Sequence, residues 1–267
     1  MDFFQKIDII NCLLPVAGFI AGMLGPISGG GGGFFFMPFF TLLMNMPAQS
    51  AVLNTLLATI PVCLVGSLRN YQNGYVNPGT VLSFALFGII GATLGAVIVR
   101  IIGSRILKTA FGIYAIIIAF NIVLSALGRT KRTVDGKCCS NQPGSQKSPS
   151  SWIYGISAGL ITGAFGTSGT GPVLAGLFNL QIPFKTVIGT SLFIILVNTM
   201  FASGVHLLSG NVNLAAIGLI TAGSVPGSVI GTKILASSEI DKYEPAAKYV
   251  YAVVIAIIGL MMIWGGQ

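Results

Sequence analysis

Long apolar segments with few charged residues between them dominate the sequence. Hydrophobic residues make up 54% of the 267 residues, charged residues only 7%, and the mean hydropathy is +0.88. Such a composition cannot supply the polar surface of a soluble fold, so the bilayer must be the solvent. A membrane-spanning helix needs roughly 20 apolar residues, which gives the chain room for about eight to ten segments. We expect an all-α, multi-pass protein of the cell membrane.

A polar stretch divides the apolar segments into two sets of five. Residues 128–151 are rich in Ser, Gly, Pro and Lys, a composition typical of a solvated linker. We therefore predict a first transmembrane repeat at 1–127, a linker at 128–151 and a second repeat at 152–267. The predicted segments are 9–24, 34–44, 50–68, 78–102 and 106–127 in the first repeat, and 152–166, 172–182, 186–208, 212–235 and 246–265 in the second.

Matching residues in the two halves indicate a duplication. An offset of 141 positions pairs Gly18, Gly22 and Gly25 with Gly159, Gly163 and Gly166. Beyond the glycine-rich loop an offset of 136 pairs Pro47 with Pro183, the GYVN turn at 74–77 with GNVN at 210–213, and Gly91 and Gly95 with Gly227 and Gly231. We interpret the last four glycines as helix-packing positions of the small-xxx-small type.

The first two segments of each half are too short for ordinary spanning helices. An 11-residue helix rises only about half of the ~30 Å hydrocarbon core. Each pair is therefore predicted to form a hairpin or broken helix, with its glycine-rich break near the middle of the membrane.

Basic residues favour an inverted arrangement of the two repeats. If each short pair enters and returns, or equally makes two full crossings, ten Lys and Arg residues lie on one side and four on the other; a single crossing would give seven on each. Because Lys and Arg gather in short cytoplasmic loops, the biased arrangement is preferred. It gives each half an odd number of crossings, makes the linker cytoplasmic and places both termini outside.

Inverted repeats with broken helices bring both breaks near the midplane, where transporters bind substrates. Glycines leave backbone N–H groups unshielded, hydroxyls add donors, and a helix that restarts after a loop directs its positive end inward. This chemistry suits a small anion, held weakly enough to be released. The candidate substrate-binding residues are Ser28, Gly29, Gly30, Gly31, Gly32 and Gly33 in the first loop, and Gly166, Thr167, Ser168, Gly169, Thr170 and Gly171 in the second.

Polar residues in the third segment of each half are further candidates. The offset of 136 pairs Asn54, Thr55 and Thr59 with Thr190, Ser191 and Ile195, and Asn198 follows in the same segment. Such side chains within lipid either bind substrate or join helices. We add four of them to the candidate site: Asn54, Thr55, Thr190 and Ser191.

These motifs resemble the sulfite exporter TauE/SafE family over nearly the whole chain. The resembling stretches are GMLGPISGGGGGFFFMPFF near the start, AVLNT from Ala51, GAFGTSGTGPVLAGLF, and Gly189-Thr190-Ser191. The resemblance implies transport of sulfite, an organosulfonate or a related sulfur oxyanion.

The position of charged residues suggests how transport is driven. No acidic residue falls in a predicted span, so a carboxylate proton relay is not expected, and His206 is interpreted as an interfacial residue. An inside-negative potential favours anion exit by about 2.3 kcal/mol per charge per 100 mV. We therefore expect voltage-driven export by alternating access. An anion channel or a proton- or sodium-coupled importer of another small anion is the alternative.

Other functional classes find little support. The sequence contains no HExxH motif, no phosphate-binding lysine loop and no acid pair within a span, so we expect no enzyme activity and no cofactor. The adjacent Cys138 and Cys139 lack further ligands nearby, which argues against a metal site. Basic residues lie at segment ends without a nucleic-acid-binding pattern. The expected partners are the anion and the lipid bilayer, and a homodimer is left open.

Overall fold

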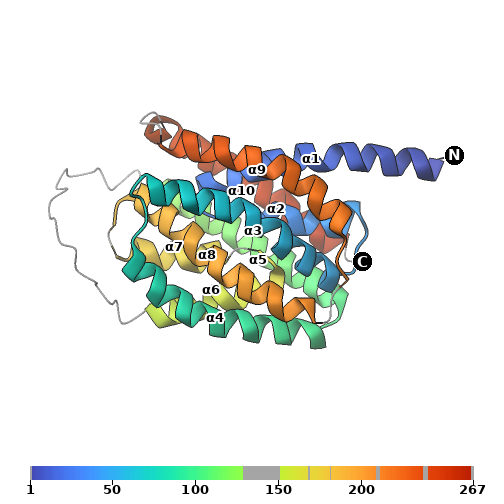
Figure 1. Cartoon of the computed structure of the whole chain (residues 1–267), viewed down its shortest axis with the longest axis horizontal. Coiled ribbons are helices and arrows are strands. Elements are labelled where there is room, and N and C mark those ends of the chain that lie inside the picture. The colour runs from blue at the N-terminus through green and yellow to red at the C-terminus, as the bar shows by residue number, and fades with distance from the viewer. Residues whose placement is uncertain are drawn as a thin grey trace.

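The computed structural model of the chain is a bundle of helices (Figure 1) and describes residues 2–128, 151–167, 169–180, 182–208, 211–236 and 240–265. The described residues contain no strand, which confirms the all-α class. Five helices are long and apolar enough to cross a membrane, as a multi-pass protein requires. The first half holds α1 (Asp2–Ser28), α2 (Gly33–Pro38), the π-helix η1 (Phe39–Leu43), α3 (Ala48–Gln72), α4 (Pro78–Ile101) and α5 (Ser104–Gly128). The second holds α6 (Ser151–Phe165), α7 (Thr170–Phe178), α8 (Phe184–Leu207), α9 (Leu214–Ala236) and α10 (Ile240–Trp264).

Some sequence-based expectations fall on residues that the structure does not describe. These are residues 129–150 of the linker, with Cys138 and Cys139, as well as Ser168 and Gly210. The linker assignment therefore stays a prediction.

Proline and asparagine set several helix boundaries. Pro47 and Pro183 immediately precede α3 and α8, where the extended backbone of each proline ends the preceding loop. Asn77 precedes α4, and its Oδ1 accepts a hydrogen bond from the backbone N–H of Thr80 at 3.3 Å. This is the expected capping chemistry, with Pro78 at the first helical position. The boundaries therefore follow from local sequence and agree with the predicted spans to within a few residues.

The first helix is longer than its predicted span of 9–24. It begins at Asp2 and continues through Pro15 and Pro26 to Ser28, so only Gly29–Gly32 are unwound. A chain within lipid must satisfy its backbone groups internally, which favours extending a helix even across prolines. The 11 residues of α2 and η1 together match the predicted short segment.

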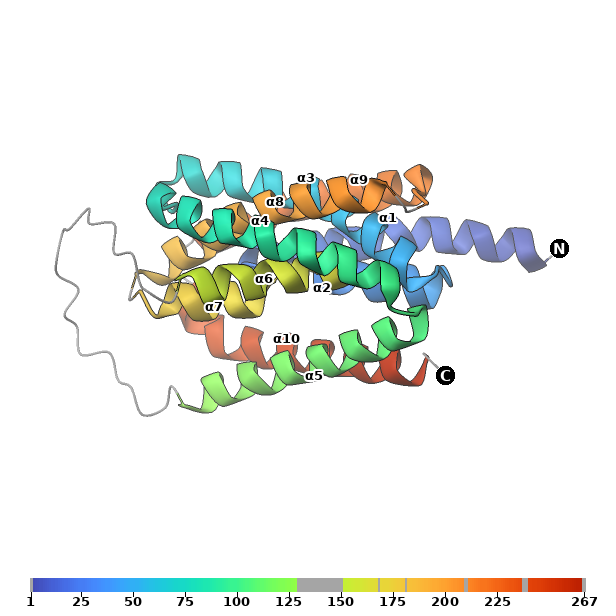
Figure 2. The ribbon, with the colours of Figure 1, turned by 90° about the horizontal axis from the view of Figure 1, so that it is seen from below.

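Both short pairs are hairpins. In the first, a β-carbon on Gly32 would approach the carbonyl oxygen of Ala21 to 2.9 Å, so α2 starts beside the last turns of α1. In the second, the Gly169 N–H donates to Thr162 Oγ1 at 2.9 Å. Figure 2 shows α1 entering the bundle from the end that carries both termini, whereas α6 and α7 occupy the opposite end.

Glycines bring the helices of the two halves into backbone contact. Helix α1 packs against α9, α4 against α6, and α5 against α10. A β-carbon at Gly159 would overlap the carbonyl oxygen of Gly88, and one at Gly227 would overlap that of Phe19. The packing role predicted for Gly91, Gly95, Gly227 and Gly231 is confirmed, because each lies against the backbone of the neighbouring helix.

Replacing Gly159 tests this packing. We expect Gly159→Ala to lower the free energy of unfolding by about 1–3 kcal/mol, because the added methyl group forces α4 and α6 apart. Thermal unfolding of the purified protein in detergent measures the change. Gly204→Ala in α8 is the matched control, since no atom lies within 4 Å of its added β-carbon. Equal melting temperatures for the two variants would contradict this account of the α4–α6 contact.

Candidate substrate-binding site

Both glycine-rich breaks are buried inside the protein. Gly29–Gly33 are all buried, as are Gly166, Thr167, Gly169 and Thr170. The backbone adopts positive φ at Gly29 (72°), Gly31 (64°), Gly32 (82°) and Gly166 (66°). Residues with a β-carbon rarely adopt this left-handed conformation, which explains why both breaks depend on glycine. Ser28 closes α1 and donates its hydroxyl to the Gly25 carbonyl at 3.0 Å, and Gly33 already belongs to α2.

The first break lies between α3 and α8, the third helices of the two halves. Ser191 Oγ on α8 donates to the Gly29 carbonyl at 3.0 Å. On the other side, a β-carbon at Gly31 would overlap Cys63 Sγ and approach Thr59 Cγ2 to 3.3 Å, both on α3. Of the predicted site residues, Ser191 thus contacts the first break, which Thr59 and Cys63 also border.

The second break lies against α3. A β-carbon at Gly166 would come within 2.7 Å of the Val52 carbonyl oxygen. Thr55 lies one turn further along α3, and Thr167 follows Gly166 in the break. Ser168, the next predicted site residue, lies outside the described residues. Gly171 is half-buried in α7, and a β-carbon there would lie 3.6 Å from the Tyr114 hydroxyl oxygen.

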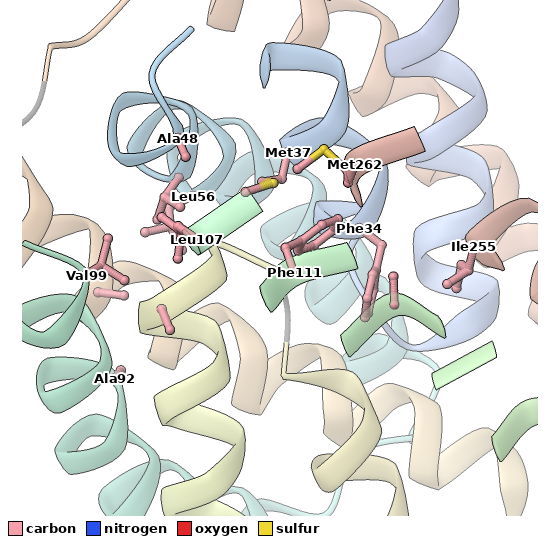
Figure 3. Close-up of a cluster of buried hydrophobic side chains, with 14 of the residues drawn as sticks. Phe34, Met37, Ala48, Leu56, Ala92, Val99, Leu107, Phe111, Ile255 and Met262 are labelled. Atoms are coloured by element: carbon pink, nitrogen blue, oxygen red, sulfur yellow. The ribbon is translucent and has the colours of Figure 1, made fainter. Parts of the chain in front are cut away.

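A cluster of four aromatic rings joins the two breaks. Phe34 follows the first break and stacks on Tyr114 of α5 at 5.7 Å between ring centroids. Phe165 precedes the second break and stacks on the same ring at 5.5 Å. Phe111 contacts both phenylalanines, at 6.3 and 5.9 Å, and Figure 3 shows it beside Phe34. These two stacks on one tyrosine bring the breaks together in the interior.

Several buried polar atoms in the second break and on the helices that border the breaks have no hydrogen-bond partner in the described part of the protein. They include Thr55 Oγ1, Thr167 Oγ1, Thr199 Oγ1 and both polar atoms of the Asn198 amide. Leaving such an atom unsatisfied costs about 1–3 kcal/mol. Their accumulation on these elements is typical of a site that receives a polar ligand or water. Thr55 and Thr167 therefore remain the best placed of the predicted hydroxyl-bearing residues.

The side chains of Asn54 and Thr190 form hydrogen bonds with backbone groups of the opposite half. Asn54 Oδ1 accepts from the Asn213 N–H at 2.8 Å, and its Nδ2 donates to the Asn211 carbonyl at 3.1 Å. Thr190 Oγ1 accepts from the Asn77 N–H at 3.1 Å. Each side chain thus holds the turn between the third and fourth helices of the other half. We call these two contacts the Asn54 latch and the Thr190 latch.

Other features of the site were absent from the sequence-based candidates. Phe34, Phe165 and Tyr114 were not singled out, although the two phenylalanines directly flank the breaks, which was the available signal. His206, expected at the interface, is buried near the end of α8, with its Nε2 2.8 Å from the Gly163 carbonyl oxygen.

Comparison with known proteins agrees with this architecture. The chain is 27% identical over 271 residues to "Probable membrane transporter protein YunE" of Bacillus subtilis, covering 95% of this chain and 97% of that protein. No solved structure matches the chain. The family model described as "Sulfite exporter TauE/SafE" matches residues 14–265, nearly the entire sequence. The chain therefore belongs to the sulfite exporter TauE/SafE family of membrane transporters.

Proposed function

We propose that this protein transports a small anion, of the sulfite or organosulfonate class, across the cell membrane by alternating access. The observation that carries the proposal is the meeting of two buried chain breaks, linked through Tyr114 and bordered by unpartnered hydroxyl groups. Interrupted helices that meet between two halves of a bundle are the usual substrate site of secondary transporters. The site is neutral, so it attracts an anion through dipoles alone.

The contacts support two repeats of inverted topology. Helix α1 packs on α9 and α6 packs on α4, which are the same contact with the two halves exchanged. The two latches are also related by the repeat. At the offset of 136, Asn54 corresponds to Thr190 and Asn77 corresponds to Asn213. In Figure 2, α5 runs toward the end that leads into the linker, whereas α10 runs away from that end.

The glycine contacts favour a different register for the first pair of helices. Gly18 and Gly22 lie on Ile220 and Ser224, and Gly155 and Gly159 lie on the corresponding Phe84 and Gly88. In this register, residues of α1 correspond to residues of α6 at an offset of 137 (155 − 18). That is four residues, or about one helical turn, less than the offset of 141 that the sequence favours. The same offset relates the starts of α2 and α7 (170 − 33) and the left-handed Gly29 and Gly166.

Backbone N–H groups supply the anion chemistry. The segment from Gly33 to Leu43 and helix α7 both begin at a break, and the first N–H groups of a helix have no partner within it. Each helix start stabilises a nearby anion by about 0.3–1 kcal/mol, or up to ~2 when partly buried. Thr55 and Thr167 add hydroxyl donors. Affinity of this size permits release, which a transport cycle requires.

Alternating access requires each end of the bundle to open in turn. The Asn54 latch holds the α8–α9 turn at the end of the bundle with the termini, and the Thr190 latch holds the α3–α4 turn at the opposite end (Figure 2). Opening one latch at a time would expose the breaks to one side only. With the linker in the cytoplasm, the membrane potential would drive anions outward.

Flux measurements in proteoliposomes test the proposed function. We expect outward flux of sulfite or a sulfonate that saturates with anion concentration. This flux should rise when an inside-negative voltage is imposed across the membrane. A dianion gains roughly 4.6 kcal/mol per 100 mV, so the voltage response should be steep. Flux that needs a pH gradient and ignores voltage would contradict the driving force, and flux that does not saturate would indicate a channel.

Gly31→Ala tests the first break. The substitution adds a β-carbon that overlaps Cys63 Sγ at a residue with φ of 64°, so we expect transport to fall at least tenfold. Flux per folded protein is the measurement. Gly74→Ala is the matched control, because Gly74 also has positive φ (74°) but meets no atom within 4 Å. If both variants transport equally well, the first break is not part of the pathway.

A further inference from the structure

Asn198 on α8 is the most unusual side chain in the described interior. It is fully buried, and neither its Nδ2 nor its Oδ1 has a hydrogen-bond partner among the described residues. The neighbouring Thr199 is also fully buried, and its Oγ1 is unpartnered. A buried amide normally satisfies both of its polar atoms, so these two residues indicate a missing ligand.

The surroundings of Asn198 show that space is reserved for its amide. A β-carbon on Gly88 of α4 would overlap Asn198 Oδ1 and lie 2.6 Å from its Nδ2. The three nearest atoms to that position all belong to Asn198. Glycine at position 88 therefore allows the amide to occupy this place.

Asn198 and Thr199 lie one turn of α8 away from the first break. Ile195 Cγ2 is 3.9 Å from the β-carbon position of Gly31, which places Ile195 beside the break. Asn198 follows three residues later, a rise of about 4.5 Å along the helix. This rise corresponds to three or four covalent bonds in an extended small ligand.

The two residues have no polar equivalents in the first half. The offset of 136 pairs Asn198 with Val62 and Thr199 with Cys63. If the unpartnered groups served only the symmetric motion of the two halves, both halves would be expected to carry them. Because only the second half carries this polar pair, the two ends of the binding site differ in polarity.

We propose that Asn198 and Thr199 form a subsite that recognises a second polar group on the transported anion. Because the amide needs both an acceptor for Nδ2 and a donor for Oδ1, the group is a hydroxyl or a carboxamide. A simple oxyanion accepts hydrogen bonds only and would leave Oδ1 unsatisfied. The substrate is thus a small anion with such a group three or four bonds from its charged centre. This inference rests on the proposed function, since it assumes that the breaks bind the charged end.

Binding of matched ligand pairs to the full-length protein tests the subsite. The probes are ethanesulfonate against 2-hydroxyethanesulfonate, and propionate against 3-hydroxypropionate, with dissociation constants from ligand-dependent thermal stabilisation. We expect the wild-type protein to bind the hydroxylated member of at least one pair roughly tenfold more tightly, as a buried hydrogen bond allows. Asn198→Val, which introduces the residue found at position 62, should reduce this ratio to about one.

Two further variants separate the subsite from general damage. Gly88→Ala keeps Asn198 but fills its place, so it should also abolish the preference. Thr221→Val removes another unpartnered hydroxyl, on α9, and should leave the ratio unchanged. A wild-type protein that binds both members equally, or an Asn198→Val protein that keeps the preference, would overturn the subsite alone. If none of the four probes binds, the proposed function fails together with it.

Discussion

An interrupted backbone inside a lipid-embedded bundle is the constraint on which the rest of this structure depends. Unwound residues expose N–H and C=O groups that lipid cannot satisfy, so they are tolerated only where protein or a polar cavity surrounds them. Here α3 and α8 border the first break and α3 borders the second, and Tyr114 of α5 stacks on a phenylalanine beside each break. The long central helices thus shield the unwound backbone of the two broken helices from lipid.

Sequence was a good guide where local chemistry decides the structure. Proline before α3 and α8, asparagine before α4 and the run of glycines after Ser28 each fix a boundary by a rule that involves only neighbouring residues. The short segments were predicted from length, because 11 residues cannot cross the core, but length left a hairpin and a broken helix as alternatives. The long α1 was not predicted, since the need to satisfy backbone groups in lipid outweighed the helix-breaking tendency of Pro15 and Pro26.

Long-range relations were harder to predict, and the repeat register shows why. Glycines are spaced four residues apart along α6, at 155, 159 and 163, so Gly18 and Gly22 still pair with glycines after a slip of one turn, although Gly25 then pairs with Thr162. Only the contacts with α4 and α9 distinguish the two registers. Likewise, an asparagine or threonine in an apolar segment does not reveal whether it faces a ligand or a turn. Asn54 and Thr190 are among the residues predicted to bind the ligand, but their polar atoms form hydrogen bonds with a turn of the opposite half.

The two latches are equivalent in position but not in strength. The Asn54 latch makes two hydrogen bonds to the opposite turn, whereas the Thr190 latch makes one. An intramolecular hydrogen bond contributes about 0.5–1.5 kcal/mol, so the difference is worth several-fold in an equilibrium. Both latches are closed here, and the polar atoms beside the breaks are buried from both ends, which describes an occluded arrangement. If the halves rock as proposed, the weaker latch opens more readily, and the end that leads into the linker is the favoured entrance. An exporter that collects its anion from the linker side would gain from this asymmetry.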